Sequence, residues 1–329
     1  INVSGSAGTL LVAISDTVTY TEGDPPVLLD TGSPAAVSDI DSPDFNGGNL
    51  TASITANEVT AEDVLGLSTA GSVSLSAGMT IGSIVSVGGV AIGTITSNGI
   101  GGADLVITFN SANATQARVA AVAQALTYAN TNTANPLAAA RSVSITVNDG
   151  DGGTSPVRIA TVNVGAVNDA PVNTVPGAQN GTEDTNLVFS TGNGNAISVA
   201  DPDATSLTVT LSVANGTLTL SGIAGISFSA GANGSATMTI SGTAAAINAA
   251  LNGLTYRGNL NYNGPDSLSI VTTDNGSSGT GGTLTDSDSV AITLAPDNII
   301  NGDAGNNTLN GTPGADYFDL RQGGDDTVS

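Results

Sequence analysis

Glycine, aspartate and asparagine recur with a period of about nine residues near the end of the chain. Residues 305–309, 314–318 and 324–328 each read Gly-x-Asp/Asn followed by any residue and then an apolar one. Glycine permits sharp turns and leaves its carbonyl accessible, while Asp and Asn supply the hard oxygen ligands that Ca²⁺ prefers. The apolar residue of each segment would stack on its counterpart in the next turn. The period predicts a calcium-binding repeat with the candidate ligands Asp303, Asn307, Asp316 and Asp325.

A second set of acidic residues occurs twice in the preceding part of the chain. Thr21-Glu22 recurs as Thr182-Glu183, and an Asp-x-Asp motif at 39–41 recurs at 201–203, each about 160 residues later. An Asp-x-Asp loop can direct two carboxylates toward one cation. No single loop has the EF-hand pattern, so about six to eight oxygens would have to converge from separate loops to hold Ca²⁺.

The pair Asn168-Asp169 lies between these two sets and would join them. Asp149 and Asp274 lie in turns that end strands, where Asp beside Gly is also ordinary hairpin chemistry. For all of these acids the alternative is a solvated turn residue. The complete set of candidate ligands in this part of the chain is Glu22, Asp39, Asp41, Asp149, Asn168, Asp169, Glu183, Asp201, Asp203 and Asp274.

Composition points to cations as partners. The 329 residues include no Cys, His or Lys, and five Arg face 28 acids, for a net charge of −23. So acidic a surface excludes nucleic acid and anionic membranes as natural partners, because both require a basic surface. No apolar run reaches the length of a membrane span, so we expect no membrane insertion. Apolar residues make up 40% of the chain, which is sufficient for folded cores.

The same composition argues against an enzyme. Without His, Cys or Lys there can be no Ser-His-Asp triad, no His-based zinc site and no Schiff base. Paired carboxylates could still hydrolyse glycosides, but Trp is absent and aromatic residues make up only 3%, so a sugar platform is missing. We therefore predict a non-catalytic protein.

The sequence pattern predicts a mainly β fold in two copies. Short runs rich in Val, Ile and Thr alternate with polar residues and stop at Asn-Gly or Gly-Gly pairs. Residues 207–213 and 217–220, separated by Asn215-Gly216, read as a hairpin. The first copy is about 35 residues longer than the second, and we place the extra residues at 71–102 as an added hairpin.

One short helix is expected in each copy. Its apolar stripe has spacings of three, four and seven residues, and alanines fill the positions between. The stripe consists of Val119, Val122 and Leu126 in the first copy and of Ile247, Leu251 and Leu254 in the second; the expected caps are Asn113 or Ser111 and Thr243 or Ser241.

These motifs resemble two known families. The Thr-Glu pairs, the Asp-x-Asp motifs and the linker at 167–171, Val-Asn-Asp-Ala-Pro, are similar to tandem cadherin-like (Ig-like) repeats of giant bacterial surface proteins. Residues 297–329 resemble the start of an RTX, hemolysin-type β-roll, although Asn307 replaces the usual Asp and the third turn is longer. The resemblance implies two β-sandwiches, each with one short helix, followed by a parallel β-roll, with Ca²⁺ clamped at the domain junctions.

The expected organisation follows from the repeats and the resemblance. Residues 1–14 form a leading strand or the end of a preceding repeat, and 15–166 form the first sandwich with its added hairpin. The second sandwich covers 167–296, and truncated RTX repeats occupy 297–329. The chain reads as part of a longer polypeptide.

Three hypotheses for function remain open. The first is a calcium-stiffened extender of a secreted RTX adhesin at the cell surface, exported by the type I route, with Ca²⁺ and neighbouring repeats of the same polypeptide as partners. The second is a subunit of a surface layer or filament, in which an unpaired strand at 9–14 adds to a neighbouring sheet and forms a homo-polymer. The third is a non-catalytic carrier for an enzyme encoded in the same polypeptide.

Overall fold

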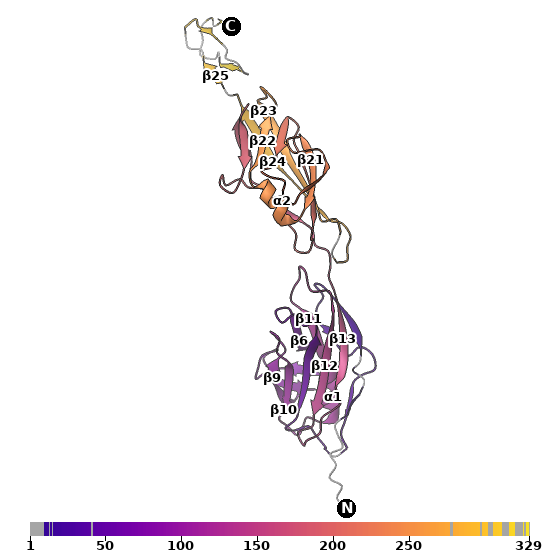
Figure 1. The fold of residues 1–329 in the computed structure, drawn as a ribbon. Helices are drawn as coiled ribbons and strands as arrows, with labels where there is room; N and C mark the ends of the chain where they lie inside the picture. The colour runs from indigo at the N-terminus through magenta and orange to yellow at the C-terminus, as the bar shows by residue number, and fades with distance from the viewer. Residues whose placement is uncertain are drawn as a thin grey trace, which may run out of the picture. The chain divides into compact units, whose positions relative to one another are not determined.

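The computed structural model describes residues 10–12, 14, 16–40, 42–276, 279–296, 298–301, 305–310, 316–319, 325 and 327–328. The chain divides into two compact units, unit 1 (Ile1–Val167) and unit 2 (Asn168–Ser329). Each unit contains a β-sandwich with one short helix (Figure 1). The predicted mainly β fold with two such sandwiches is therefore confirmed.

Unit 1 has two facing sheets, a strand pair and helix α1 (Gln116–Gln124). The smaller sheet has the order β3-β11-β6, and β1 pairs with β4. In spatial order, the larger sheet consists of β2 (Thr17–Thr21), β13 (Arg158–Gly165), β12 (Ala140–Asn148), β5 (Asn49–Ala56), β10 (Leu105–Phe109), β9 (Val90–Asn98), β8 (Ile84–Val87) and β7 (Val73–Leu75). The remaining strands are β1 (Leu10–Val12), β3 (Val27–Leu28), β4 (Ala36–Ser38), β6 (Asp63–Leu67) and β11 (Leu126–Asn130).

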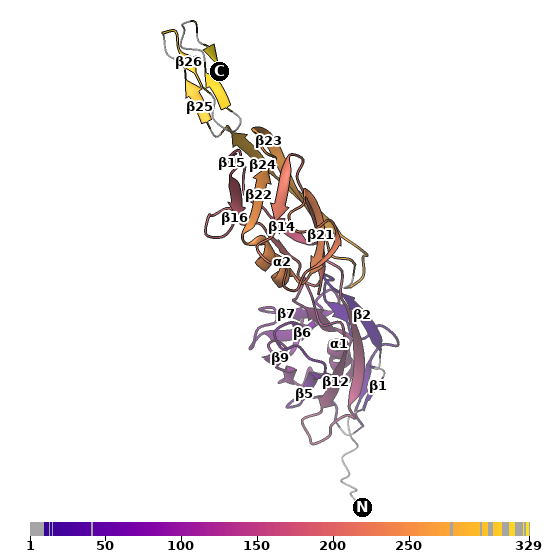
Figure 2. The same cartoon turned by 45° about the horizontal axis from the view of Figure 1, so that its top comes forward.

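Unit 2 repeats this plan with helix α2 (Ala244–Leu251). Figure 2 shows strands of its smaller sheet, β16 and β22, beside strands of its larger sheet. The larger sheet consists of β15 (Gln179–Thr182), β24 (Thr285–Ala295), β23 (Gly264–Thr273), β18 (Leu207–Ser212), β21 (Thr237–Gly242) and β20 (Ser227–Ala230). The smaller sheet consists of β16 (Asn186–Phe189), β22 (Leu254–Gly258) and β19 (Gly216–Thr219), and β14 (Val172–Thr174) pairs with β17 (Ser198–Ala200).

The two units match strand for strand in chain order, apart from β7 and β8. These two strands extend the larger sheet of unit 1 at one edge and come from residues 73–87, inside the segment where the sequence places an insertion. Each unit has its own core because strand residues alternate in direction. In β12, for example, Val143, Ile145 and Val147 are fully buried and the Ser and Thr residues between them face outward.

The hairpin predicted at 207–220 is wrong. Strand β18 belongs to the larger sheet and β19 to the smaller one, so the chain crosses between the layers at Asn215-Gly216. A side chain at Gly216 would lie 2.5 Å from the ring of Tyr256 and from the Arg257 carbonyl. The glycine therefore permits β19 to pair closely with β22, and both strands place their apolar residues in one shared core.

The helices are shorter than their apolar stripes suggest. Leu126 and Leu254 are the first residues of strands β11 and β22, because the chain leaves each helix directly into the smaller sheet. Thr243 caps α2 as predicted and accepts a hydrogen bond from the Ala246 N–H at 3.2 Å. The first helix begins after Thr115, whose side chain makes no capping bond, rather than after Ser111 or Asn113.

The strand expected to lie unpaired at 9–14 is paired. Leu10–Val12 forms β1, which runs antiparallel to β4 and matches the pairing of β14 with β17 in unit 2. It is thus the first strand of unit 1 itself. In the C-terminal part, β25 (Asn298–Asn301) pairs in parallel with β27 (Asp316–Asp319), and β26 (Thr308–Leu309) pairs in parallel with β28 (Thr327–Val328). The complete β-roll remains a prediction.

A buried ion pair distinguishes the core of unit 1. Arg141 Nε lies 3.0 Å from Asp63 Oδ2, and both side chains are 0% exposed. Asp63 also accepts hydrogen bonds from the Tyr128 hydroxyl and from Asn130 Nδ2. Arg141 donates two further bonds to the carbonyls of Leu137 and Ala139. The carboxylate is thus almost fully surrounded by donors, which offsets the cost of burying its charge.

In unit 2 the corresponding tyrosine, Tyr256, donates to a different acid, Asp266. Asp266 precedes Ser-x-Ser in β23 as Arg141 precedes Ser-x-Ser in β12, and its Oδ2 accepts a hydrogen bond from the Tyr256 hydroxyl at 2.8 Å. The registers of the smaller sheets place Gly216 where unit 1 has Asp63. Burial acts to raise the pKa of Asp266, but bonds from the Asn215 and Ser267 N–H groups, Tyr256 and the Ala214 N–H outweigh it and lower the pKa.

Replacing Arg141 with Met should destabilise unit 1 by about 3 to 5 kcal/mol, because Asp63 would remain buried without its counter-charge. Urea unfolding measures this difference. The exposed Arg257→Met serves as the control and should change the free energy of unfolding by less than about 0.5 kcal/mol. Equal effects of the two substitutions would contradict a role for the buried pair.

The Asp266→Asn variant should be less stable than the wild type at pH 7. A carboxylate with a lowered folded-state pKa contributes stability above its unfolded value, near 4, and loses it as the pH falls through the folded value. The difference between the melting temperatures should therefore shrink below about pH 4. Calorimetry across a pH series tests this, with the exposed Asp104→Asn as control.

Candidate cation site

The predicted ligands of unit 2 gather at one end of its sandwich. Asn168 and Asp169 are its first two residues, Asp201 and Asp203 follow β17, and Asp274 follows β23. Hydrogen bonds connect all three segments. The sequence folds this way because β14 begins where its antiparallel partner β17 ends, and Asp274 after β23 is bonded to Asn168 before β14.

Asn168 is fixed inside this end of unit 2. It is 5% exposed, its N–H donates to the Thr280 carbonyl at 2.8 Å, and its Nδ2 donates to Asp274 Oδ2 and the Gly282 carbonyl. Its side-chain carbonyl, Oδ1, is buried and has no hydrogen-bond partner. A buried acceptor without a donor is costly, so this oxygen is available for a ligand.

Asp274 holds the asparagine in place. Its Oδ1 accepts bonds from the N–H groups of Gly276 at 2.8 Å and Leu284 at 3.0 Å. Burial acts to raise the pKa of this carboxyl, but the bonds from Leu284, Asn168 and Gly276 have the larger combined effect and lower it. Asp274 is therefore ionised and positions Asn168.

The Asp-x-Asp loop presents carboxylates close to each other. Asp201 Oδ1 accepts bonds from the N–H groups of Asp203 at 3.0 Å and Ala204 at 2.7 Å, and Asp203 Oδ2 accepts one from the Asp169 N–H at 3.2 Å. Asp201 Oδ2 and Asp169 Oδ2 are buried without partners. Burial, a hydrogen bond with Asp201 and the charges of Asp201 and Asp169 raise the pKa of Asp203 to about 6.

The donor set of this end suits a hard cation. Asn168, Asp169 and Asp201 have unpartnered buried oxygens there, and the chain has no Cys thiolate or His imidazole to offer. The chain has five Arg for 28 acids, so positive side chains are scarce beside its carboxylates. Oxygen donors of this kind fit Ca²⁺ rather than Zn²⁺.

The site is not preassembled. Among the described residues, no group of three or more Asp, Glu, His or Cys side chains is arranged to hold a metal ion as it stands. The carboxylate of Asp201 is held by the N–H groups of Asp203 and Ala204 through one oxygen only. A cation would therefore have to draw its ligands together from separate loops on binding.

The corresponding end of unit 1 carries similar groups. Asp39 is 8% exposed and follows β4, and Asp149 is 3% exposed and follows β12. Ser42 joins the two loops, because its N–H donates to Asp39 Oδ1 at 3.3 Å and its hydroxyl donates to Asp151 Oδ2 at 3.0 Å. Asp41 lies outside the described residues.

Glutamates occupy the opposite ends of the sandwiches. Glu22 Oε2 accepts a bond from the Val167 N–H at 2.9 Å, and Glu22 Oε1 is buried without a partner. Glu183 is fully buried, and its Oε2 accepts a bond from Asn263 Nδ2 at 3.0 Å. These residues therefore do not join the Asp-x-Asp groups of their own unit.

Glu62 is a further candidate ligand that the comparison of the two repeats did not identify. Its Oε1 accepts a bond from Asn132 Nδ2 at 2.9 Å, and its Oε2 is buried without a partner. Because the second copy has no glutamate at the equivalent position, the repeat gave no signal there. The pair Glu62-Asp63 directly before an apolar strand was the one available clue.

The C-terminal candidates are only partly described. Asn307 is half-buried, and Asp325 is exposed and donates its N–H to Asn306 Oδ1 at 2.9 Å. Asp316 is the first residue of β27. Asp303 lies outside the described residues.

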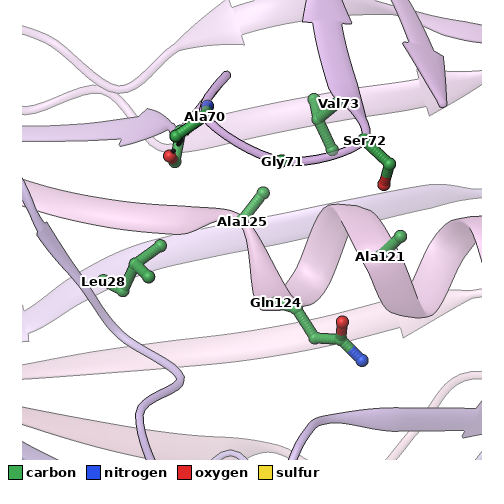
Figure 3. Close-up of a pocket in the computed structure, with 9 residues that line it drawn as sticks. Leu28, Ala70, Gly71, Ser72, Val73, Ala121, Gln124 and Ala125 are labelled. Atoms are coloured by element: carbon green, nitrogen blue, oxygen red, sulfur yellow. Dashed lines mark hydrogen bonds between the residues drawn. The ribbon is translucent and has the colours of Figure 1, made fainter. Parts of the chain in front are cut away.

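Two cavities of unit 1 are lined by neutral side chains. One, of about 310 Å³, lies between the end of helix α1 and the 70–73 segment, with Leu28, Ala121 and Gln124 in its wall (Figure 3). Another, of about 400 Å³, is lined by residues that include Pro26, Val64 and Met79. Neither wall contains a charged side chain, so neither cavity offers an acid or base for catalysis. In the described residues, no helix is long and apolar enough to span a bilayer.

Comparisons with known proteins find matches of two kinds. A family model described as GEX2, Protein GAMETE EXPRESSED 2 domain, matches residues 183–280. Human CDH23 EC21-23 matches with a TM-score of 0.31 and 15% identity, over 88% of this chain and 70% of that chain. Human Protocadherin-24 EC1-2 matches with a TM-score of 0.27 and 14% identity, over 88% and 99%.

A longer solved structure is matched over part of its length. Protocadherin gammaB7 EC3-6 has a TM-score of 0.28 and 13% identity, over 92% of this chain and 53% of that chain. The chain thus spans about half the length of that structure. No curated protein matches the chain.

Replacing Asp201 with Asn should stabilise unit 2 when no divalent cation is present. The substitution removes one of the like charges that face Asp203 and Asp169, and an amide can still accept the bonds at the Oδ1 position. Thermal melting in a chelator should show an unchanged or higher melting temperature than the wild type. A clearly lower melting temperature would contradict charge repulsion at this site.

Proposed function

We propose that the chain is a calcium-stiffened structural region of a large secreted bacterial RTX adhesin, which holds binding modules away from the cell surface. The observation that carries the proposal is the set of buried, unpartnered oxygens on Asn168, Asp169 and Asp201 at the start of unit 2. Two β-sandwiches in tandem, in a chain without His, Cys or Lys, agree with a structural role.

The residues that would hold Ca²⁺ in unit 2 are Asn168, Asp169, Asp201 and Asp203. Bound Ca²⁺ supplies positive charge among carboxylates that otherwise repel one another. Asp274 orients Asn168, and the Asx turn of Asp201 holds the loop so that its second oxygen faces inward. These second contacts limit how far the donors must move when an ion binds.

The short connection between the units supports stiffening. The Val167 N–H is held by Glu22 of unit 1, and the N–H of the next residue, Asn168, is held by Thr280 of unit 2. Each of these two residues is therefore held by a hydrogen bond within its own unit.

An extracellular location fits the chemistry. Calcium sites of extracellular modules have dissociation constants of about 10⁻⁴ to 10⁻³ M, so they fill outside cells and stay empty inside. The chain contains no Cys, so disulfides cannot stabilise it and a metal is the available substitute. The sequence period and the two parallel strand pairs at 298–328 support the RTX assignment of the C-terminal part.

A self-assembling surface layer or filament is the alternative function. Its proposed donor strand at 9–14 contributes β1 to unit 1, so polymerisation would have to use another segment. The edge strands β7 and β20 are open to pairing on one side. Light scattering of the purified chain in calcium separates the two functions, because an extender remains monomeric.

Calcium titration with thermal melting tests the proposal. At about 100 times the dissociation constant, one bound ion should stabilise the folded state by about 2.7 kcal/mol, which appears as a rise in melting temperature. Mg²⁺ at the same concentration should have a much smaller effect, because it demands a tight octahedral site and loses its water reluctantly.

Asp201→Asn should lose most of the calcium-induced rise, while the matched variant Asp184→Asn should retain it. Asp184 is an acid of the same unit whose carboxylate accepts bonds only from the Asn261 N–H. A wild type that does not respond to calcium would refute the proposal. Equal responses of the two variants would move the site away from the Asp-x-Asp loop.

A further inference from the structure

The ends of the two sandwiches that carry Glu22 and Glu183 are built differently. In the smaller sheets, Tyr128 faces Leu65 in unit 1 and Tyr256 faces Leu218 in unit 2. Three residues before these leucines, directly before β6 and β19 begin, unit 1 has Glu62 and unit 2 has Asn215. An acid of unit 1 is thus replaced by an amide in unit 2.

The polar groups at this end of unit 2 are matched to one another. Asn263 Nδ2 donates to Glu183 Oε2 at 3.0 Å, and Asn215 Nδ2 donates to the Tyr262 hydroxyl at 3.0 Å. The Tyr262 hydroxyl in turn donates to the Pro265 carbonyl at 2.6 Å. In unit 1, by contrast, both Glu22 and Glu62 keep one buried oxygen without a partner.

Asp266, another acid near this end of unit 2, is also occupied. Asp266 accepts bonds from the N–H groups of Ala214 at 3.1 Å and Asn215 at 2.9 Å, and from the Tyr256 hydroxyl at 2.8 Å. A calcium ion requires about six to eight oxygen ligands, and amide N–H donors that point at a carboxylate occupy the positions a cation would need. The Glu183 end therefore does not fit a calcium ion.

We propose that the Glu183 end of unit 2 is a metal-free polar cluster, in which the exposed Asn263 takes the place of a cation. This inference rests on the proposed function, since it separates one end of unit 2 that responds to calcium from one that does not. It replaces the sequence-based expectation that Glu183 is a ligand.

Equilibrium dialysis with calcium on the full chain tests this assignment. Glu183→Gln should bind the same number of calcium ions as the wild type and show the same calcium-induced rise in melting temperature. Asp201→Asn, at the other end of unit 2, should lose one ion. Loss of an ion in Glu183→Gln would overturn this inference alone, whereas a wild type that binds no calcium would overturn the proposed function.

Terbium luminescence gives a second measurement that does not depend on folding of the Glu183 variant. Tb³⁺ replaces Ca²⁺ at oxygen sites and emits when a nearby tyrosine is excited. The Tyr262→Phe variant removes the tyrosine whose hydroxyl belongs to the cluster. Unchanged emission from the Tb³⁺-loaded variant is expected, and a drop of more than about one third would place an ion at this end and refute the inference.

Discussion

Repulsion between neighbouring carboxylates is the constraint on which the acidic end of unit 2 depends. The chain has five Arg for 28 acids, and one of those Arg residues lies inside the core of unit 1. Asp169 and Asp201 each keep one buried oxygen without a hydrogen-bond partner, and their charges act on Asp203 beside them. Charge of this kind destabilises a fold in isolation and stabilises it once a cation arrives.

The two sandwiches show how one architecture accommodates different charges. A tyrosine of the smaller sheet donates to an acid in both units, but the acid comes from β6 in unit 1 and from β23 in unit 2. Asp63 needs Arg141 beside it because it is fully buried, whereas Asp266 lies near the surface and is stabilised by backbone N–H groups. Gly216 stands in unit 2 at the position that Asp63 has in unit 1, and a side chain there would collide with the ring of Tyr256.

The two ends of unit 2 differ in how asparagine side chains contact the acids. Asn263 donates its amide Nδ2 to Glu183 Oε2. Asn168 likewise donates its Nδ2 to Asp274, but its buried Oδ1 has no hydrogen-bond partner. The two ends therefore differ in whether an asparagine oxygen is left without a donor.

The sequence by itself determined the β class, the duplication, the position of the two helices and the acids grouped at 168–169, 201–203 and 274, because alternation of apolar residues and internal repeats are local signals. Only the tertiary structure decided that β18 and β19 lie in different sheets, that Leu10–Val12 belongs to unit 1 and that Glu62 has an unpartnered oxygen. It also decided that Glu183 is held by Asn263. These outcomes depend on which strands become neighbours and which atoms meet in the folded chain, and pairing between distant segments leaves no local pattern in the sequence.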